Sequence, residues 1–281
     1  MMSFVDFILN VAALLLWMRW RSLPFDPFNK RIPATLIGTL RRVAPSRFQR
    51  WHLLAVIGAL LILRALFYWQ VGSAIRWAGK INLGIIALFF PADSFGRMVL
   101  FSILSFGLTL GIFYLWMLLL SIACPREEKS GLIHSLIRRQ LGRVDDWPLW
   151  VKIILPFAVT TFFWWLVSWL LTWNQIIPPF ISPAHRIEEA CVIGLGSYLA
   201  WKFVLAALLM LHLLNTYIYF GKQPMWNYVN ALAQTLLKPL KKIPLQLGRV
   251  DFAPIVGIAL VFFIAQTAAL GLAKLYAALP F

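Results

Sequence analysis

The chain has 281 residues, of which 61% are hydrophobic and 13% are charged, and its mean hydropathy is +0.79. Soluble domains contain about 25% charged residues, so this composition excludes an ordinary soluble domain and predicts an integral membrane protein. The formal net charge of +16 comes from loops between apolar segments. This distribution is typical of membrane proteins that obey the positive-inside rule, and it predicts no nucleic-acid partner.

Six segments are long and apolar enough to cross a bilayer, which takes about 20 residues. They are residues 3–19, 51–72, 98–123, 148–172, 190–219 and 254–278. The predicted fold is therefore an all-α membrane protein with about six transmembrane helices, of which the first is marginal. The extra segment 81–91 ends at Pro91 and is too short to span, so re-entrant, interfacial and spanning placements stay open for it.

Basic residues alternate between the loops. Three loops are rich in Lys and Arg: residues 20–50, 124–147 and 220–253. The loops between them hold only Arg76, Lys80, Arg97 and Arg186. The positive-inside rule therefore predicts that the three basic loops are cytoplasmic and that both termini are exported. This orientation puts Cys124 and Cys191 near opposite faces of the membrane, so we expect no disulfide between them.

One motif is repeated along the chain. QLGRVDDWP at residues 140–148 and QLGRVDFAP at residues 246–254 match at seven of nine positions, and SRFQRW at residues 46–51 is a diverged third copy. Each copy follows a basic loop and precedes an apolar segment, so the sequence predicts three repeated helical hairpins with the same in–out sense. The predicted units are residues 1–72, 98–173 and 190–281, with an insert at 73–97 for which a re-entrant placement stays open.

The two clear copies of the motif share four residue types: Gly142, Arg143, Asp145 and Pro148, then Gly248, Arg249, Asp251 and Pro254. Glycine can take a positive φ and end a helix, aspartate can cap the next helix, and proline suits a first turn. Arginine can pair with the aspartate or contact a phosphate. The motif predicts a turn that returns the chain to the bilayer; the alternative is a contact with a headgroup or partner. No nucleophile or base recurs with it, so we predict no catalytic residue.

Segments 32–43 and 229–243 place apolar residues at helical spacing, with Lys and Arg at other positions. Such amphipathic helices lie in the membrane interface, with their cations near anionic headgroups. The alternative is a soluble helix that packs on a partner. Pro239 should kink the second segment or split it in two.

Polar residues within predicted spans are functional candidates. There are four main ones: Asp6, Arg64, Lys202 and His212. We expect Asp6 and Arg64 to pair across the first hairpin. Two interpretations stay open, namely polar contacts between helices and a path for protons or ions. His52 and His134 lie near the same predicted interface, but no spacing signature indicates haem ligation; we predict neither a cofactor nor a metal.

The stretch Lys238–Pro244, followed by Gly248–Pro254 and an apolar helix, resembles the YggT family. The likeness is strongest in the third unit and weakest in the first, and family members usually have one or two hairpins rather than three. The resemblance implies a multi-pass protein of a bacterial inner membrane or a thylakoid. Relatives are tied to haem attachment during cytochrome assembly, to cell division and nucleoid or chloroplast organisation, and to osmotic tolerance.

This resemblance implies a non-enzymatic scaffold or assembly factor for membrane complexes. Its expected partners are a bilayer with anionic headgroups and other membrane proteins. The alternative is a small-solute or ion transporter or channel that uses Asp6, Arg64, Lys202 and His212. That alternative requires the four side chains to converge on one wet cavity.

Overall fold

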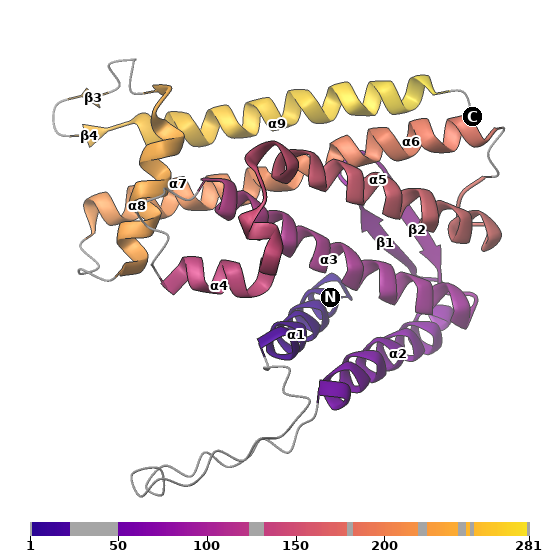
Figure 1. The fold of residues 1–281 in the computed structure, drawn as a ribbon. Helices are drawn as coiled ribbons and strands as arrows, with labels where there is room; N and C mark the ends of the chain where they lie inside the picture. Colours follow the sequence, from indigo (N-terminus) through magenta and orange to yellow (C-terminus); the bar gives the residue numbers. More distant parts are fainter. Residues whose placement is uncertain are drawn as a thin grey trace, which may run out of the picture.

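The computed structural model describes residues 2–22, 50–123, 132–178, 182–218, 224–240, 246–247 and 250–279, and these are mostly helical (Figure 1). The first half of the chain contains α1 (Met2–Ser22), α2 (Arg50–Ala74), β1 (Ala78–Asn82), β2 (Ala87–Pro91), α3 (Phe95–Ala123), α4 (Leu132–Leu141) and the 3-10 helix η3 (Gly142–Asp146). The second half contains α5 (Leu149–Trp173), α6 (Pro183–Gly196), the 3-10 helix η4 (Ser197–Ala200), α7 (Trp201–Tyr217), α8 (Pro224–Leu237), β3 (Gln246–Leu247), β4 (Val250–Asp251) and α9 (Ala253–Ala278).

Five helical stretches among the described residues are long and apolar enough to cross a membrane. They are Trp51–Ala74, Phe95–Ala123, Leu149–Trp173, Pro183–Tyr217 and Ala253–Ala278. These stretches indicate a multi-pass membrane protein. The sequence predicted six spans; the one missing from this set is α1, which carries Asp6, Arg19 and Arg21 within its 21 residues.

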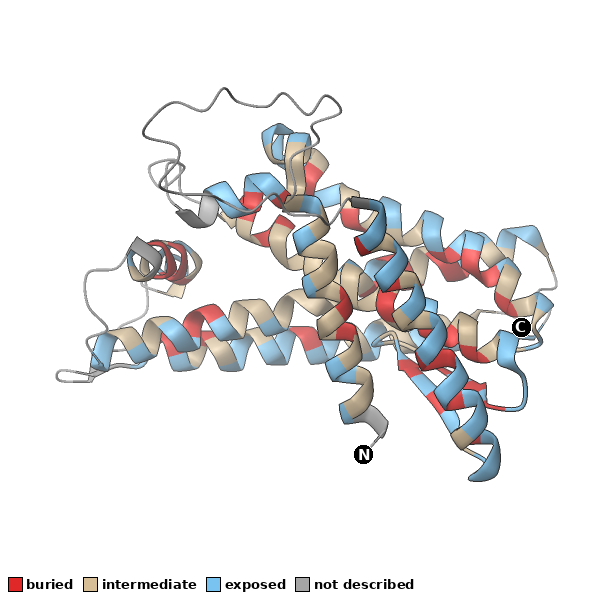
Figure 2. Ribbon diagram, turned by 90° about the horizontal axis from the view of Figure 1, so that it is seen from below, coloured by how far each residue is buried: buried red, intermediate tan, exposed pale blue. Residues whose placement is uncertain are grey.

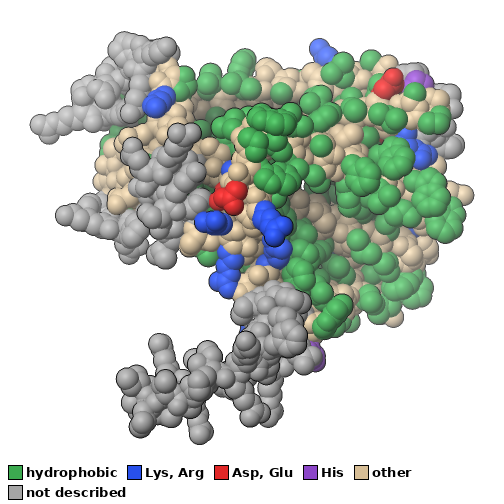
Figure 3. Space-filling model, in the orientation of Figure 1, with side chains coloured by type: hydrophobic (Ala, Val, Ile, Leu, Met, Phe, Trp, Pro, Cys, Tyr) green, Lys and Arg blue, Asp and Glu red, His purple; other side chains and the backbone are tan. Residues whose placement is uncertain are grey.

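The outer surface of the long helices is strongly apolar (Figure 3). Trp173, Phe263 and Phe162 are 77%, 68% and 65% exposed. Buried residues occur in narrow stripes where helices meet, and most of each helix faces outward (Figure 2). A helix that is apolar all round belongs in a core or in a bilayer, so these exposed faces are suited to lipid.

The predicted insert contains a feature that an all-α fold does not include. β1 and β2 pair antiparallel, with Ala78 opposite Pro91 and Asn82 opposite Ala87. The strands bury alternate residues, as a half-buried strand should. Gly84, at a φ of +88°, makes the tip, where its N–H donates to Asn82 Oδ1 at 2.9 Å. The segment 81–91 is thus part of a β-hairpin, and the all-α prediction is wrong at this point.

The β1–β2 hairpin packs among the helices. Its tip lies against η4, since a Cβ on Gly196 would come within 2.5 Å of Ile85 Cδ1, and one on Gly84 would lie 3.6 Å from Leu199 Cδ1. η4 interrupts the candidate span Pro183–Tyr217 near its middle. Irregular backbone at membrane depth is tolerated where protein or water covers it, and here helices cover one face of the hairpin.

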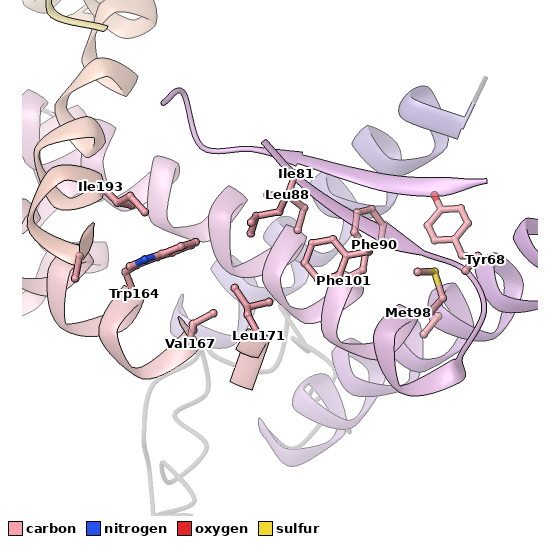
Figure 4. Close-up of a cluster of buried hydrophobic side chains, with 13 residues drawn as sticks. Tyr68, Ile81, Leu88, Phe90, Met98, Phe101, Trp164, Val167, Leu171 and Ile193 are labelled. Carbon is pink, nitrogen blue, oxygen red and sulfur yellow. The ribbon is translucent and has the colours of Figure 1, made fainter. Parts of the chain in front are cut away.

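The largest core cluster packs against one face of this hairpin (Figure 4). It joins side chains of α2, β1, β2, α3, α5 and α6: Ala65, Tyr68, Ile81, Leu88, Phe90, Ala92, Met98, Phe101, Trp164, Val167, Leu171, Ala190 and Ile193. The Phe101 ring stands 5.6 Å from the Phe90 ring and 5.9 Å from the Tyr68 ring, measured between ring centres. The hairpin therefore ties the α2–α3 half of the molecule to the α5–α6 half.

The order of elements repeats, although the packing differs. A long helix, a short helix, the QLGRVD motif and a second long helix follow one another in α3–α4–η3–α5 and again in α7–α8–β3–β4–α9. α7 packs closely on α9, whereas α5 packs chiefly on α6 and α3 chiefly on α2. α8 ends at Leu237, two residues before Pro239. Segment 32–43 and most of SRFQRW lie outside the described residues, so the three-unit division stays a prediction.

Candidate functional site

A buried polar network joins α1, α2 and α3. Arg64 Nη2 donates to Asp6 Oδ1 at 2.6 Å and to Ser105 Oγ at 2.9 Å, and Nη1 donates to Asn10 Oδ1 at 2.7 Å. Asn10 Nδ2 also donates to Ser105 Oγ, at 3.0 Å. The Tyr68 hydroxyl donates to Asp6 Oδ1 at 2.7 Å. The ion pair that the sequence predicted is present, within a larger network.

Burial makes this network costly to disturb. The Arg64 side chain is fully buried, and that of Asp6 keeps 20% exposure. The guanidinium carbon lies 5.3 Å from the centre of the Phe101 ring and 5.7 Å from that of the Tyr68 ring. A carboxylate and two ring faces therefore replace the water that this cation loses.

Three members of the network were not predicted from the sequence: Asn10, Tyr68 and Ser105. Two of them carried a signal, since Asn10 follows Asp6 by four residues and Tyr68 follows Arg64 by four. This spacing places side chains on one face of a helix. Nothing comparable indicated Ser105, which comes from a third helix.

The first copy of the repeated motif forms a second buried site. Gly142 has a φ of +62° and follows α4 directly, as predicted. Ser121 Oγ donates to Asp145 Oδ1 at 2.6 Å. Lys152 Nζ donates to Ser121 Oγ at 2.8 Å and to the carbonyl oxygen of Asp145 at 2.6 Å, and lies 3.7 Å from Asp145 Oδ1. Both charged side chains are nearly buried, at 9% and 5% exposure for Lys152 and Asp145.

The predicted capping role of Asp145 is wrong. The N-cap residue of α5 is Pro148, and no side chain caps that helix end. The carboxylate instead turns toward α3 and Lys152. A buried cation stabilises a carboxylate more strongly than hydrogen bonds from two backbone N–H groups at a solvated helix end. Arg143 is exposed, whereas the side chain of Asp145 is nearly buried beside Lys152.

The second copy takes a different shape. Gln246 pairs with Asp251 and Leu247 with Val250, in a two-residue antiparallel ladder. Pro254 is the second residue of α9 and is buried, which agrees with its predicted place in a first helical turn. Gly248, Arg249 and the side chain of Asp251 lie outside the described residues.

Replacing Asp145 with asparagine should lower the free energy of unfolding by about 1 to 2 kcal/mol. The amide can still accept from Ser121, but Lys152 loses a buried anion. Asp146 is the matched control, because it is 66% exposed and lies 3.8 Å from Arg138, and an exposed pair contributes about 1 kcal/mol at most. Thermal unfolding in detergent compares the two variants. Equal midpoints for Asp145→Asn and Asp146→Asn would show that the buried pair adds nothing.

The structure does not bring the four polar candidates together. Arg64 and Asp6 belong to the α1–α3 network. His212 Nδ1 lies 2.8 Å from Asn230 Oδ1 of α8, and Lys202 Nζ lies 5.0 Å from the centre of the Phe203 ring. An open recess is lined by other residues: Asp93, Ser94, Arg97, Trp173, Asn174 and Gln175. The convergence that a transport site requires is therefore not seen in the described parts of the chain.

One buried carboxyl group was not predicted from the sequence. Glu189 of α6 is 2% exposed and accepts a hydrogen bond from the Tyr276 hydroxyl of α9 at 3.0 Å. It stands one turn after His185, in a stretch that sequence analysis assigned to a loop before the fifth span. The contact ties α6 to α9 near the start of one candidate span and the end of another.

The candidate metal and haem ligands are the histidine, cysteine and acidic side chains. Within the described ranges, no three side chains of His, Cys, Asp or Glu gather in a way that could hold a metal ion. His52 is exposed, and the side chain of His134 lies outside the described residues. The distance between the two imidazoles is therefore outside the described part of the chain, and the absence of a haem stays a prediction.

These features define the class as a multi-pass helical membrane protein with buried polar contacts between helices. Residues 190–272 match the family described as CCB3/YggT. The match covers the second half of α6, all of α7 and α8, and most of α9, which is less than a third of the chain. It supports the predicted likeness to the YggT family in the third unit and does not reach the first two. Searches of curated proteins and of solved structures found no match.

Proposed function

We propose that this protein is a non-enzymatic scaffold or assembly factor for membrane protein complexes. The similarity of residues 190–272 to the CCB3/YggT family and the five apolar helices fit an accessory role in a membrane. We further propose a bacterial inner membrane, with α4 and α8 at the cytoplasmic face and both termini exported. The distribution of basic residues along the sequence supports that orientation.

The observation that carries the proposal is the separate engagement of the intramembrane polar groups. Arg64 is bound by three side chains from two other helices, and Lys152 is closed off by Asp145 and Ser121. Such contacts hold helices together, which supports a structural role for these groups over a transport pathway. A transporter or channel remains the alternative, and it would need a wet route that includes Lys202 or His212.

The outward faces of the molecule favour a binding role. α4 presents Leu136, which is 56% exposed, while Ile137 on its other side is buried against α7 and α8. Trp147, which follows η3, and Trp150, at the start of α5, are also exposed, at 43% and 66%. An exposed apolar surface rimmed by charge marks an interaction site with protein or membrane.

Site-specific cross-linking tests the scaffold proposal. A photoreactive amino acid at Leu136 should give a discrete adduct with another membrane protein in intact cells. The same amino acid at Phe263, on the lipid-facing side of α9, is the control and should give none. The partner, once tagged, should recover this chain in return. Adducts at neither position, together with solute flux through the purified protein in vesicles, would favour the transporter instead.

A further inference from the structure

Arginine side chains from three elements meet at one end of the molecule. Arg21, near the end of α1, donates through Nη2 to the carbonyl oxygen of Gln140 at 2.9 Å, and Arg139 Nη2 donates to the carbonyl oxygen of Ser22. These two contacts hold the end of α1 beside α4 and η3. The resulting α1–α4 arginine face consists of five exposed arginines: Arg19, Arg21, Arg138, Arg139 and Arg143.

The acidic residues near this face leave its charge largely uncompensated. Asp145 turns inward to Lys152 and is 5% exposed. Asp146 is the exposed carboxylate, and it lies 3.8 Å from Arg138. Figure 3 shows blue side chains gathered around a single red one on this side of the molecule. The face therefore presents several guanidinium groups with one nearby anion among the described residues.

The position of the face relative to the apolar surface fixes its depth. η3 ends at Asp146, and the candidate span α5 begins at Leu149. Trp147 and Trp150 lie in the chain between Arg143 of η3 and the remainder of α5, and both are exposed. Tryptophan gathers at the level of lipid headgroups, so the arginines lie at the height of phosphate groups.

We propose that the α1–α4 arginine face binds the phosphate of an anionic phospholipid headgroup. A guanidinium group donates two parallel hydrogen bonds to phosphate oxygens, which an ammonium group cannot do. The exposed tryptophans and Leu149 offer the acyl chains of the same lipid an apolar surface. This site adds to the proposed scaffold function and does not depend on it, because lipid binding can be measured on the purified protein alone.

Arg138 and Arg143 are the residues to change, because Arg21 and Arg139 also hold α1 in place. The double variant Arg138→Gln/Arg143→Gln should bind phosphatidylglycerol and cardiolipin about 25-fold more weakly, since each basic residue near a membrane surface contributes about fivefold. The pair Arg138→Lys/Arg143→Lys keeps the charge and should lose only part of the affinity. The matched control is Arg76→Gln/Lys80→Gln, which removes two charges from the region of the β1–β2 hairpin.

Retention of added lipid by the detergent-purified protein, read by native mass spectrometry, measures these affinities. Phosphatidylcholine is the zwitterionic probe and should bind weakly to every variant. Inorganic phosphate at millimolar concentration should not displace the lipid, and displacement would assign the site to free phosphate. Equal losses in the face variant and the control would show a general charge effect, and unchanged binding in a folded face variant would overturn the site. Unfolding midpoints establish that each variant is folded.

Discussion

Replacing Arg64 with methionine is expected to lower the free energy of unfolding by about 3 kcal/mol, because the change leaves Asp6 largely buried without its cation. Arg64 is fully enclosed and donates to Asp6, Asn10 and Ser105. Methionine fills a similar length of space but donates nothing. Thermal unfolding of the purified protein in detergent should show the loss, and limited proteolysis should show earlier cleavage in α1.

A double-mutant cycle separates the ion pair from the packing of its members. The variant Asp6→Asn/Arg64→Met has no buried charge at this site, so it should regain part of the stability that Arg64→Met loses. Arg138→Met is the control, because its partner Asp146 is 66% exposed and an exposed pair contributes about 1 kcal/mol or less. If the double variant is as unstable as the sum of its single changes, then the two charges are not coupled.

This prediction bears on how α1 is held. α1 is not among the five helices that are apolar enough to cross a membrane by themselves. Its polar residues Asp6 and Asn10 face Arg64, and Trp17 Nε1 donates to the Tyr114 hydroxyl at 2.9 Å. A helix with weak intrinsic preference for the bilayer can be retained by contacts with its neighbours. The Arg64 network is thus a condition for the placement of α1, whichever function the protein serves.

The long helices and the Asp6–Arg64 pair were the most predictable parts of the fold. A membrane span can be recognised from its length and its apolar composition, and both depend only on local sequence. The Asp6–Arg64 pair could be predicted because the two residues carry opposite charges at similar depth in adjacent helices. Within a bilayer such charges have few other partners. The register of other contacts, such as that of Ser105 with Arg64, depends on how a third helix packs, and no local pattern encodes it.

The β1–β2 hairpin could not be predicted from local sequence alone. Its buried residues alternate, as in Ile81 on β1 and Leu88 and Phe90 on β2, but two strands of five residues are too short to be told apart from a buried helical turn. Apolar composition then favoured a membrane segment. What decides the outcome is packing against side chains of α2, α3, α5 and α6, which come together only in the folded protein.

The repeated hexamer also shows that tertiary contacts decide local structure. QLGRVD forms the end of α4 and part of the 3-10 helix η3 at its first occurrence, and a two-residue β-ladder at its second. The identical residues therefore do not fix the local conformation. At the first site Ser121 and Lys152 bind Asp145 and hold a helical turn. Contacts from other helices thus outweigh local preference.

Replacing Gly194 with alanine is expected to lower the free energy of unfolding by about 2 to 3 kcal/mol, because the added methyl group overpacks the contact between α5 and α6. A Cβ there would overlap Thr161 Oγ1 and would lie 3.2 Å from the carbonyl oxygen of Phe157. The carbonyl belongs to the α5 backbone, so relief requires that the two helices separate. Small residues at helix contacts in membranes serve this close approach.

Gly111→Ala in α3 is the matched control, and its effect should have the opposite sign. A Cβ on Gly111 meets no atom within 4 Å, and alanine is favoured over glycine within a helix by up to about 1 kcal/mol. Unfolding midpoints in the same detergent should therefore fall for Gly194→Ala and stay level or rise for Gly111→Ala. Separation of α5 from α6 would also withdraw Trp164 and Ile193 from the β1–β2 hairpin, so a cysteine at Ile85 should label faster in Gly194→Ala than in the parent. Equal midpoints and equal labelling rates would mean that α5 and α6 have room to accept the methyl group, and that the hairpin is held by α2 and α3 alone.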